Sequence, residues 1–108
     1  MKATLVLRKE VMVRNRSGEA VQIQMDIFEV RGEEAYKYPD NYRIGWIAYD
    51  VLDPMRRILF DSHPPKGPHF HIDEGLSQSF VWSSLSEALQ LFYFIVCRHF
   101  DVDIKEFR

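Results

Sequence analysis

The chain has 108 residues, of which 46% are apolar and 14% aromatic, and its formal net charge is −2. This length suits one domain, and the apolar fraction is that of a globular protein and excludes a disordered chain. The near-neutral charge excludes binding of nucleic acid through overall positive charge, so any such contact must use a local patch.

The first two predicted elements form a long antiparallel hairpin. Residues 3–14 and 20–30 both alternate apolar and polar side chains, which predicts two strands with one buried face each. In the first strand, the apolar side includes Leu5 and Leu7. Residues 15–18 read Asn-Arg-Ser-Gly and predict the turn between the strands. The outward face carries charges of both signs, so we expect it to be solvated.

A polar loop, residues 31–41, follows the hairpin, and we expect one helical turn within it. Its length is at the upper end of the usual range for loops. Tyr36, Lys37 and Tyr38 suit either of two roles. They could stack on bases and touch phosphate, or they could pack the loop against the domain.

The next two strands are predicted at residues 42–51 and 56–62, with a turn at 52–55. The first of them is apolar on both faces, which is typical of a strand in the centre of a sheet. Arg43 is a candidate substrate-binding residue, because a guanidinium group forms bidentate pairs with phosphate oxygens. An ion pair with an acid on a neighbouring strand is the alternative role for Arg43.

Residues 58–73 hold the densest group of titratable side chains, including three of the four histidines. The group consists of Asp61, His63, Lys66, His69, His71 and Asp73. Residues 58–60 and 70–72 predict short strands. Because side chains at i and i+2 share a face, His69 and His71 should project together, with Phe70 on the core side.

The connection between these two short strands contains Pro64, Pro65 and Gly67. The two prolines predict an extended, rigid segment, and the glycine allows a positive φ or a close approach of the backbone to a ligand. Lys66 would then be a cation held over the two imidazoles.

Four roles fit this group of side chains. In metal-free phosphodiester cleavage, His69 and His71 would transfer protons, Lys66 would neutralise the phosphate and Asp61 would orient a histidine. In a metal site, the two histidines would bind the ion together with a carboxylate or His63. The remaining roles are simple anion binding and an ordinary surface loop.

The same residues carry a resemblance to a known family. Residues 60–63 and 66–72, which read F-D-S-H and K-G-P-H-F-H-I, resemble the Y-D-N-x-x-x-K-G-x-H-x-H-I block of the TumE-type toxins of bacterial and archaeal toxin–antitoxin modules. The resemblance implies a small toxin encoded beside an antitoxin. The chain departs from the family at Ser62-His63, where asparagine is common, and this bears on any role for His63.

Other segments are similar to the same family. Residues 2–9 resemble its opening strand, Tyr42-Arg43 its strand entry, and residues 80–84 the lead-in to its last helix. The loop at 31–41 is longer than is usual in the family.

The last predicted element is a helix from residue 85 to about 99. Ser84 and Glu87 have the spacing of a capping box at its start. Its apolar stripe has i, i+3, i+4 spacing and consists of Leu85, Ala88, Leu89, Phe92, Ile95, Val96 and His99. Leu91 and Phe94 fall outside this stripe and predict a second apolar contact, either with a second copy of the chain or with an antitoxin. His99 lies near the predicted C-terminus of the helix, where a positively charged side chain is favourable.

Residues 1–108 are therefore expected to form one α+β domain, with a mostly antiparallel sheet of four or five strands and the C-terminal helix on one face. The leading functional hypothesis is a toxin that cleaves RNA without a cofactor. Its catalytic residues would be His69, His71, Lys66 and Asp61, and its substrate-binding residues would be Arg43 and His63. The alternatives are a non-enzymatic interaction protein and a metal-dependent hydrolase that uses the H-x-H pair.

The expected partners are a cognate antitoxin, RNA and a second copy bound through the C-terminal helix. The single cysteine, Cys97, cannot form an internal disulfide, which predicts a cytoplasmic protein. No apolar run reaches the roughly 20 residues of a membrane span, and no signal peptide is visible, so we expect no membrane contact.

Overall fold

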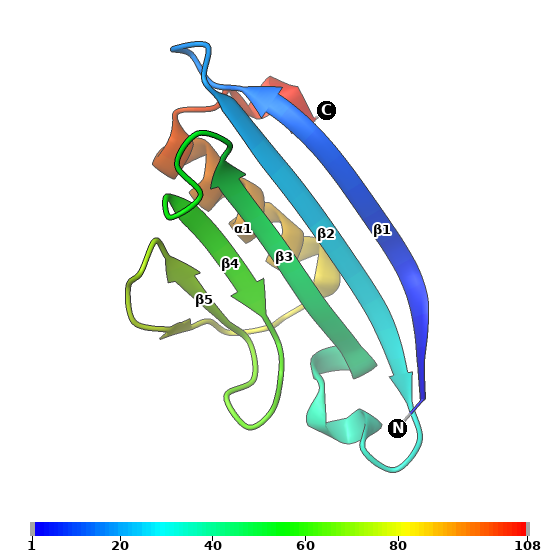
Figure 1. The fold of residues 1–108 in the computed structure, drawn as a ribbon. Helices are drawn as coiled ribbons and strands as arrows, with labels where there is room; N and C mark the ends of the chain where they lie inside the picture. The colour runs from blue at the N-terminus through cyan, green and yellow to red at the C-terminus, as the bar shows by residue number, and fades with distance from the viewer. Residues whose placement is uncertain (1, 108) are drawn as a thin grey trace.

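Six strands form one sheet in which each strand pairs with its neighbour in the sequence. The computed structural model describes residues 2–107, and every strand pair in it is antiparallel (Figure 1). The strands are β1 (Lys2–Arg14), β2 (Ala20–Arg31), β3 (Tyr42–Asp50), β4 (Arg57–Asp61), β5 (His69–Ile72) and β6 (Gln78–Ser79). The predicted α+β fold is confirmed, and the sheet has one strand more than the upper expected number. β3 pairs with both β2 and β4, so its predicted central place is correct.

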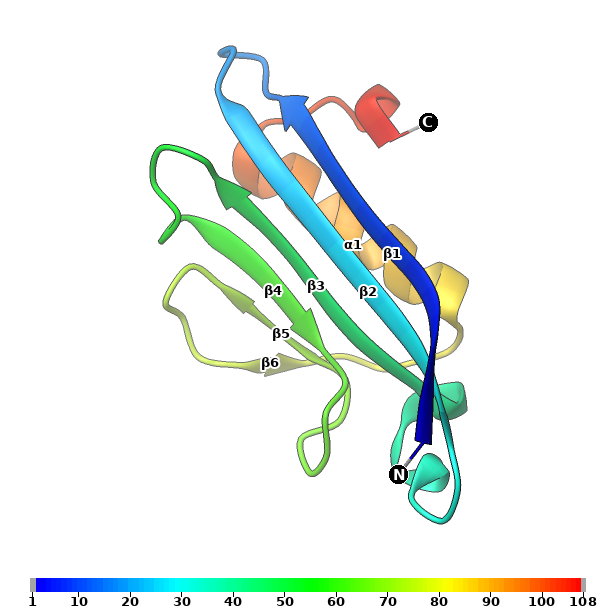
Figure 2. The ribbon, with the colours of Figure 1, turned by 45° about the vertical axis from the view of Figure 1, so that its right-hand side comes forward.

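One helix, α1 (Leu85–Phe100), runs along one face of the sheet (Figures 1 and 2). Its buried side chains have helical spacing and consist of Ala88, Phe92, Val96 and Phe100. The ring of Phe92 lies 5.4 Å from that of Trp46 on β3 and 5.2 Å from that of Phe60 on β4. These aromatic contacts and the alternating apolar residues of β2 to β4 form the core.

The start of α1 is fixed by Ser84, as the sequence predicts. The Ser84 side chain accepts a hydrogen bond from the Glu87 backbone N–H at 3.1 Å. The second half of the predicted capping box differs, because the Glu87 carboxylate accepts the hydroxyl of Ser83.

The N-terminal half of β1 departs from the predicted pattern. The register shifts between Leu5 and Leu7, so that Leu5 pairs with Phe28 and Leu7 with Ile27. Leu5 and Leu7 are 45% and 39% exposed, and the prediction that they lie on a buried face is wrong. The physical reason is the position of β1 at the sheet edge together with the bulge, which interrupts the alternation of side chains.

The loop between β2 and β3 carries two short 3-10 turns, η1 (Ala35–Lys37) and η2 (Pro39–Asn41). Tyr38 lies between them and is buried, whereas Tyr36 is exposed. The Trp82 indole N–H donates to the Asp40 carboxylate at 2.7 Å and thereby fixes this loop to the segment before α1. The one helical turn that the sequence predicts at residues 33–38 corresponds to η1, and η2 is an additional turn.

Within residues 2–107, no helix is both long enough and apolar enough to cross a lipid bilayer. The face of the sheet opposite α1, which we call the open face, is not covered by any element of this same part of the chain (Figure 2). The strand register aligns a row of residues across the sheet: Arg8, Asp26, Gly45, Asp61 and His69. Because directly paired residues share a face, this row places titratable side chains from four strands on the open face.

Candidate functional site

His69 and His71 project together from β5 onto the open face. Their ring centroids are 5.5 Å apart and the ring planes lie at 83°. Phe70 points to the other face and stacks on Phe60, with 5.1 Å between the centroids. The arrangement predicted for this pair from the two-residue period of a strand is therefore present.

Backbone carbonyls hold both imidazole rings. His69 Nδ1 lies 2.7 Å from the carbonyl oxygen of Gly67, and His71 Nδ1 lies 3.1 Å from that of Gly75. A carbonyl oxygen can only accept a hydrogen bond, so each Nδ1 must carry the proton. In the neutral ring the lone pair then belongs to Nε2, which is the atom left to take a proton or bind a ligand.

A hollow of about 350 Å³ lies beside these rings on the open face. We call it the histidine hollow, and its lining includes Gly45, Leu59, Asp61, His69 and His71. One Asp61 oxygen, Oδ1, accepts the backbone N–H of His63 at 2.7 Å. Asp61 thus shapes the start of the loop after β4, while the carbonyls of Gly67 and Gly75 orient the imidazoles.

A second hollow, of about 310 Å³, adjoins the first and shares Gly45 and Asp61 with it. We call it the Asp26 hollow, and its other lining residues are Asp26, Phe28, Arg43, Ile44 and His63.

Two aromatic contacts involve residues of the Asp26 hollow, one between strands and one between loops. The Arg43 guanidinium lies 4.5 Å from the centre of the Phe28 ring, a cation–π contact. The edge of Tyr38 faces the ring of His63, with 6.3 Å between the centroids. The structure thus brings the predicted substrate-binding residues Arg43 and His63 together in one hollow.

Lys66 lies on the loop that projects beyond the sheet between β4 and β5 (Figure 1). It is exposed and lines neither hollow. The prediction of an extended segment at Pro64 and Pro65 is wrong, because the loop closes into a turn in which the Gly67 N–H donates to the His63 carbonyl at 3.1 Å. Gly67 has a φ of +71°, so its predicted positive φ is confirmed. The phosphate-neutralising role of Lys66 remains a prediction.

The residues from 2 to 107 contain no group of three or more histidine, cysteine or acidic side chains arranged to hold a metal ion. The imidazole pair on β5 therefore contributes two nitrogen ligands without a third side chain of these types in place.

A polar cluster that the sequence did not reveal joins the end of β5 to the end of α1. His99 Nε2 donates to Asp73 Oδ1 at 2.8 Å, and the same oxygen accepts the Arg57 backbone N–H at 2.9 Å. The Arg56 guanidinium donates to the His99 carbonyl at 2.8 Å. His99 therefore binds a specific carboxylate, in addition to its predicted place at the C-terminal end of the helix.

The contacts of this cluster change the acidity of Asp73. Partial burial acts to raise the pKa of its carboxyl group, but the hydrogen bonds from His99 and Arg57 act in the opposite direction. With the nearby charges of His99 and Arg56, they hold the pKa of Asp73 below its ordinary value. The signal in the sequence was the aspartate directly after the H-x-H strand, but its partner lies 26 residues away.

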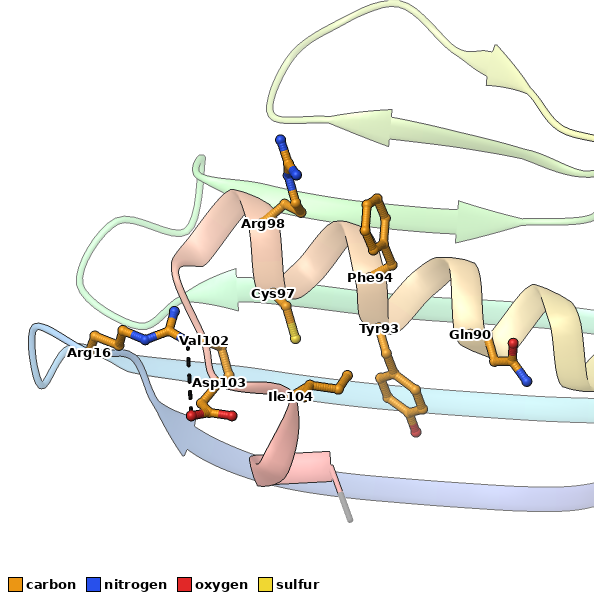
Figure 3. Close-up of a pocket in the computed structure, with 9 residues that line it drawn as sticks. All are labelled: Arg16, Gln90, Tyr93, Phe94, Cys97, Arg98, Val102, Asp103 and Ile104. Carbon is orange, nitrogen blue, oxygen red and sulfur yellow. Dashed lines mark ion pairs between the residues drawn. The ribbon is translucent and has the colours of Figure 1, made fainter.

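A third hollow, of about 460 Å³, lies between α1 and the C-terminal turn η3 (Ile104–Phe107). In Figure 3, Tyr93 and Cys97 lie on the side of α1 toward Ile104, whereas Phe94 and Arg98 project on the other side. Burial, with a contribution from the Asp103 carboxylate, raises the pKa of the Cys97 thiol. The thiol is therefore protonated and a weak nucleophile at neutral pH. We call the apolar hollow between α1 and η3 the helix groove.

A scan of protein-family models gives no match to this chain, and comparisons with curated proteins and with solved structures give no match either.

Proposed function

We propose that the protein is the toxin of a toxin–antitoxin module and that it cleaves RNA at the histidine hollow. The observation that carries this proposal is the pairing of His69 and His71 on the open face, with each Nδ1 bonded to a carbonyl and each Nε2 left for chemistry. The resemblance of residues 60–72 to the TumE-type block supports the cellular setting.

The imidazole pair can perform both proton transfers of phosphodiester cleavage. One neutral imidazole removes the proton of the ribose 2′-hydroxyl, whose oxygen attacks the adjacent phosphorus. The other imidazole, in its protonated form, gives a proton to the departing 5′-oxygen. The two rings lie beside one hollow with 5.5 Å between their centroids, a spacing that is compatible with contact to one phosphate group.

Three charged residues besides the two histidines have roles in this proposal. Arg43, which lines the adjoining Asp26 hollow, and Lys66, on the loop between β4 and β5, would neutralise the phosphate, because guanidinium and ammonium groups stabilise the charge that develops on its oxygens. Asp61 would fix the start of the loop that carries His63.

The partner surface that we propose is the outer side of α1 with the helix groove. Phe94 is 58% exposed there, and an exposed aromatic residue beside an apolar groove favours contact with another protein. A cognate antitoxin or a second copy of the chain would cover it. A toxin that meets its antitoxin where both are synthesised would act in the cytoplasm.

The test is the substitution His71→Ala. Loss of one proton-transfer group should lower the rate of RNA cleavage at least about 100-fold and abolish growth arrest in cells. The purified protein would be incubated with a mixed-sequence RNA in the presence of a chelator, and its circular dichroism would confirm that the fold is intact. Leu76→Ala, in an exposed loop near β5, is the matched control and should cleave at the wild-type rate.

Two results would contradict the proposal. Undiminished cleavage by the His71→Ala variant would reject the assigned residues. A wild-type protein that cleaves no RNA but still binds a partner protein would favour the interaction-protein alternative, and cleavage that is lost only with the chelator would favour the metal-dependent one.

A further inference from the structure

The Asp26 hollow has no part in the proton transfers described above, although it adjoins the hollow where they would occur. The two hollows share Gly45 and Asp61, so a single ligand can occupy both. Gly45 and His69 lie two strands apart in one register row, which corresponds to roughly 10 Å across the sheet. That separation is comparable to the span from a nucleobase to its own 3′-phosphate.

The shape of the Asp26 hollow suits a flat ring. Gly45 contributes no side chain, and a Cβ atom placed there would meet no atom within 4 Å, so the floor of the hollow is open. At its edge the Arg43 guanidinium lies over the Phe28 ring, and both groups are planar. Bases stack on both kinds of group in protein–RNA complexes.

The polar groups of the hollow determine which edge of such a ring can form hydrogen bonds there. Asp26 Oδ1 accepts from the Arg8 guanidinium at 2.8 Å, and Asp61 Oδ1 accepts the His63 amide at 2.7 Å. The second oxygen of each carboxylate has no hydrogen-bond partner among residues 2–107, so both remain available to a ligand. Carboxylate oxygens only accept hydrogen bonds, and the ligand edge must therefore present donors.

Guanine is the base that meets this requirement best, because its N1–H and N2 amino group are adjacent donors. Adenine and cytosine each place an acceptor nitrogen beside their single amino group, and uracil places its one N–H between two carbonyls. We propose that the Asp26 hollow binds the guanine base on the 5′ side of the cleaved phosphate. This inference rests on the proposed function, since it assigns the base specificity of the same site.

The experiment is a nuclear magnetic resonance titration of the ¹⁵N-labelled protein with 3′-GMP, 3′-AMP and 3′-IMP. The inosine nucleotide is the matched ligand, because it lacks only the N2 amino group of guanine. We expect 3′-GMP to shift the amide resonances of Gly45 and Phe28, and to bind at least about tenfold more tightly than the other two nucleotides.

The variant Asp26→Asn should reduce this preference to less than about threefold, because it replaces a carboxylate oxygen with an amide donor. Arg8→Ala is the matched control: it breaks the same exposed ion pair but keeps the Asp26 carboxylate, so the preference for 3′-GMP should persist. Of the two hollows, Asp26 lines the one without His69 and His71, so its variant should leave the two histidines in place.

Equal affinities for the three nucleotides, or an unchanged preference in Asp26→Asn, would overturn the base site. The two proposals fail separately. A protein that prefers 3′-GMP but cleaves no RNA contradicts the proposed function and keeps the guanine site. A protein that cleaves RNA equally after all four bases keeps the function and contradicts the guanine site.

Discussion

At the scale of single residues, Asp73 connects the strand that carries the histidine pair to the helix that covers the core. Its Oδ1 atom accepts hydrogen bonds from both the Arg57 amide and His99, so the end of β5 and the end of α1 meet at one carboxylate. Its backbone has a φ of +54°, a conformation that aspartate tolerates better than most residues. Asp73 directly follows β5, which carries His71.

The lowered pKa of Asp73 predicts a loss of stability in acid. A carboxyl group whose folded-state pKa lies below its unfolded value of 3.8 stabilises the fold above that pH, and the contribution disappears as the pH falls through the folded-state pKa. Asp73→Asn should therefore lower the free energy of unfolding near pH 6 by about 0.5–1 kcal/mol, a value reduced for solvent screening because the side chain is 44% exposed.

Urea denaturation of the wild type and Asp73→Asn between pH 3 and pH 7 would measure this effect. The difference between the two proteins should shrink below about pH 4. Asp53→Asn, at an exposed turn position, is the control for the change in net charge. A difference that stays constant across the whole range would contradict the assigned role of the ionised carboxylate.

At the scale of elements, the cap of α1 gives a prediction of its own. Ser84 Oγ is the acceptor for the Glu87 N–H, one of the backbone donors that lack a partner at a helix start. Ser84→Ala should lower the free energy of unfolding by about 1 kcal/mol. Ser86→Ala, at an exposed position in the first turn of α1, should change it by less than about 0.5 kcal/mol. Chemical denaturation would compare them, and equal effects would show that the cap contributes nothing.

The elements that could be predicted are those whose signal is local in the sequence. The apolar spacing of α1, the cap at Ser84 and the shared face of His69 and His71 follow from the periods of a helix and a strand. The bulge at the start of β1 could not be predicted, because alternation in the sequence does not show where the register shifts.

The parts of the site that escaped prediction depend on contacts between distant segments. The position of Gly45 follows only from the register, which places it between Asp26 and Asp61. The hydrogen bond between Asp73 and His99 needs the helix to return to the end of β5. A single sequence contains the residue types of these contacts but not their partners in space.

At the scale of the whole molecule, the exposed side of α1 predicts association. Phe94→Asp places a charge on that surface and should shift a self-associating protein to the monomer, because a charged group is costly to bury at an interface. Sedimentation velocity over a range of concentrations would measure the change. Leu76→Asp is the control, since Leu76 is 90% exposed in a loop away from α1.

A wild-type protein that remains monomeric at every concentration would contradict self-association through α1. In that case, weaker binding of the proposed antitoxin by Phe94→Asp than by Leu76→Asp would assign the surface to that partner. Equal binding by both variants would remove α1 from the partner surface.

The order of the elements along the chain also affects synthesis on the ribosome. Every strand pairs with its neighbour, so hairpins can form as the polypeptide emerges, but α1 begins at Leu85, after all six strands. Until that helix has been translated, Trp46 and Phe60 remain exposed to water on the apolar face of the sheet. A nascent chain that stalls before residue 85 should therefore recruit chaperones or aggregate. In the finished polypeptide, α1 covers the apolar face.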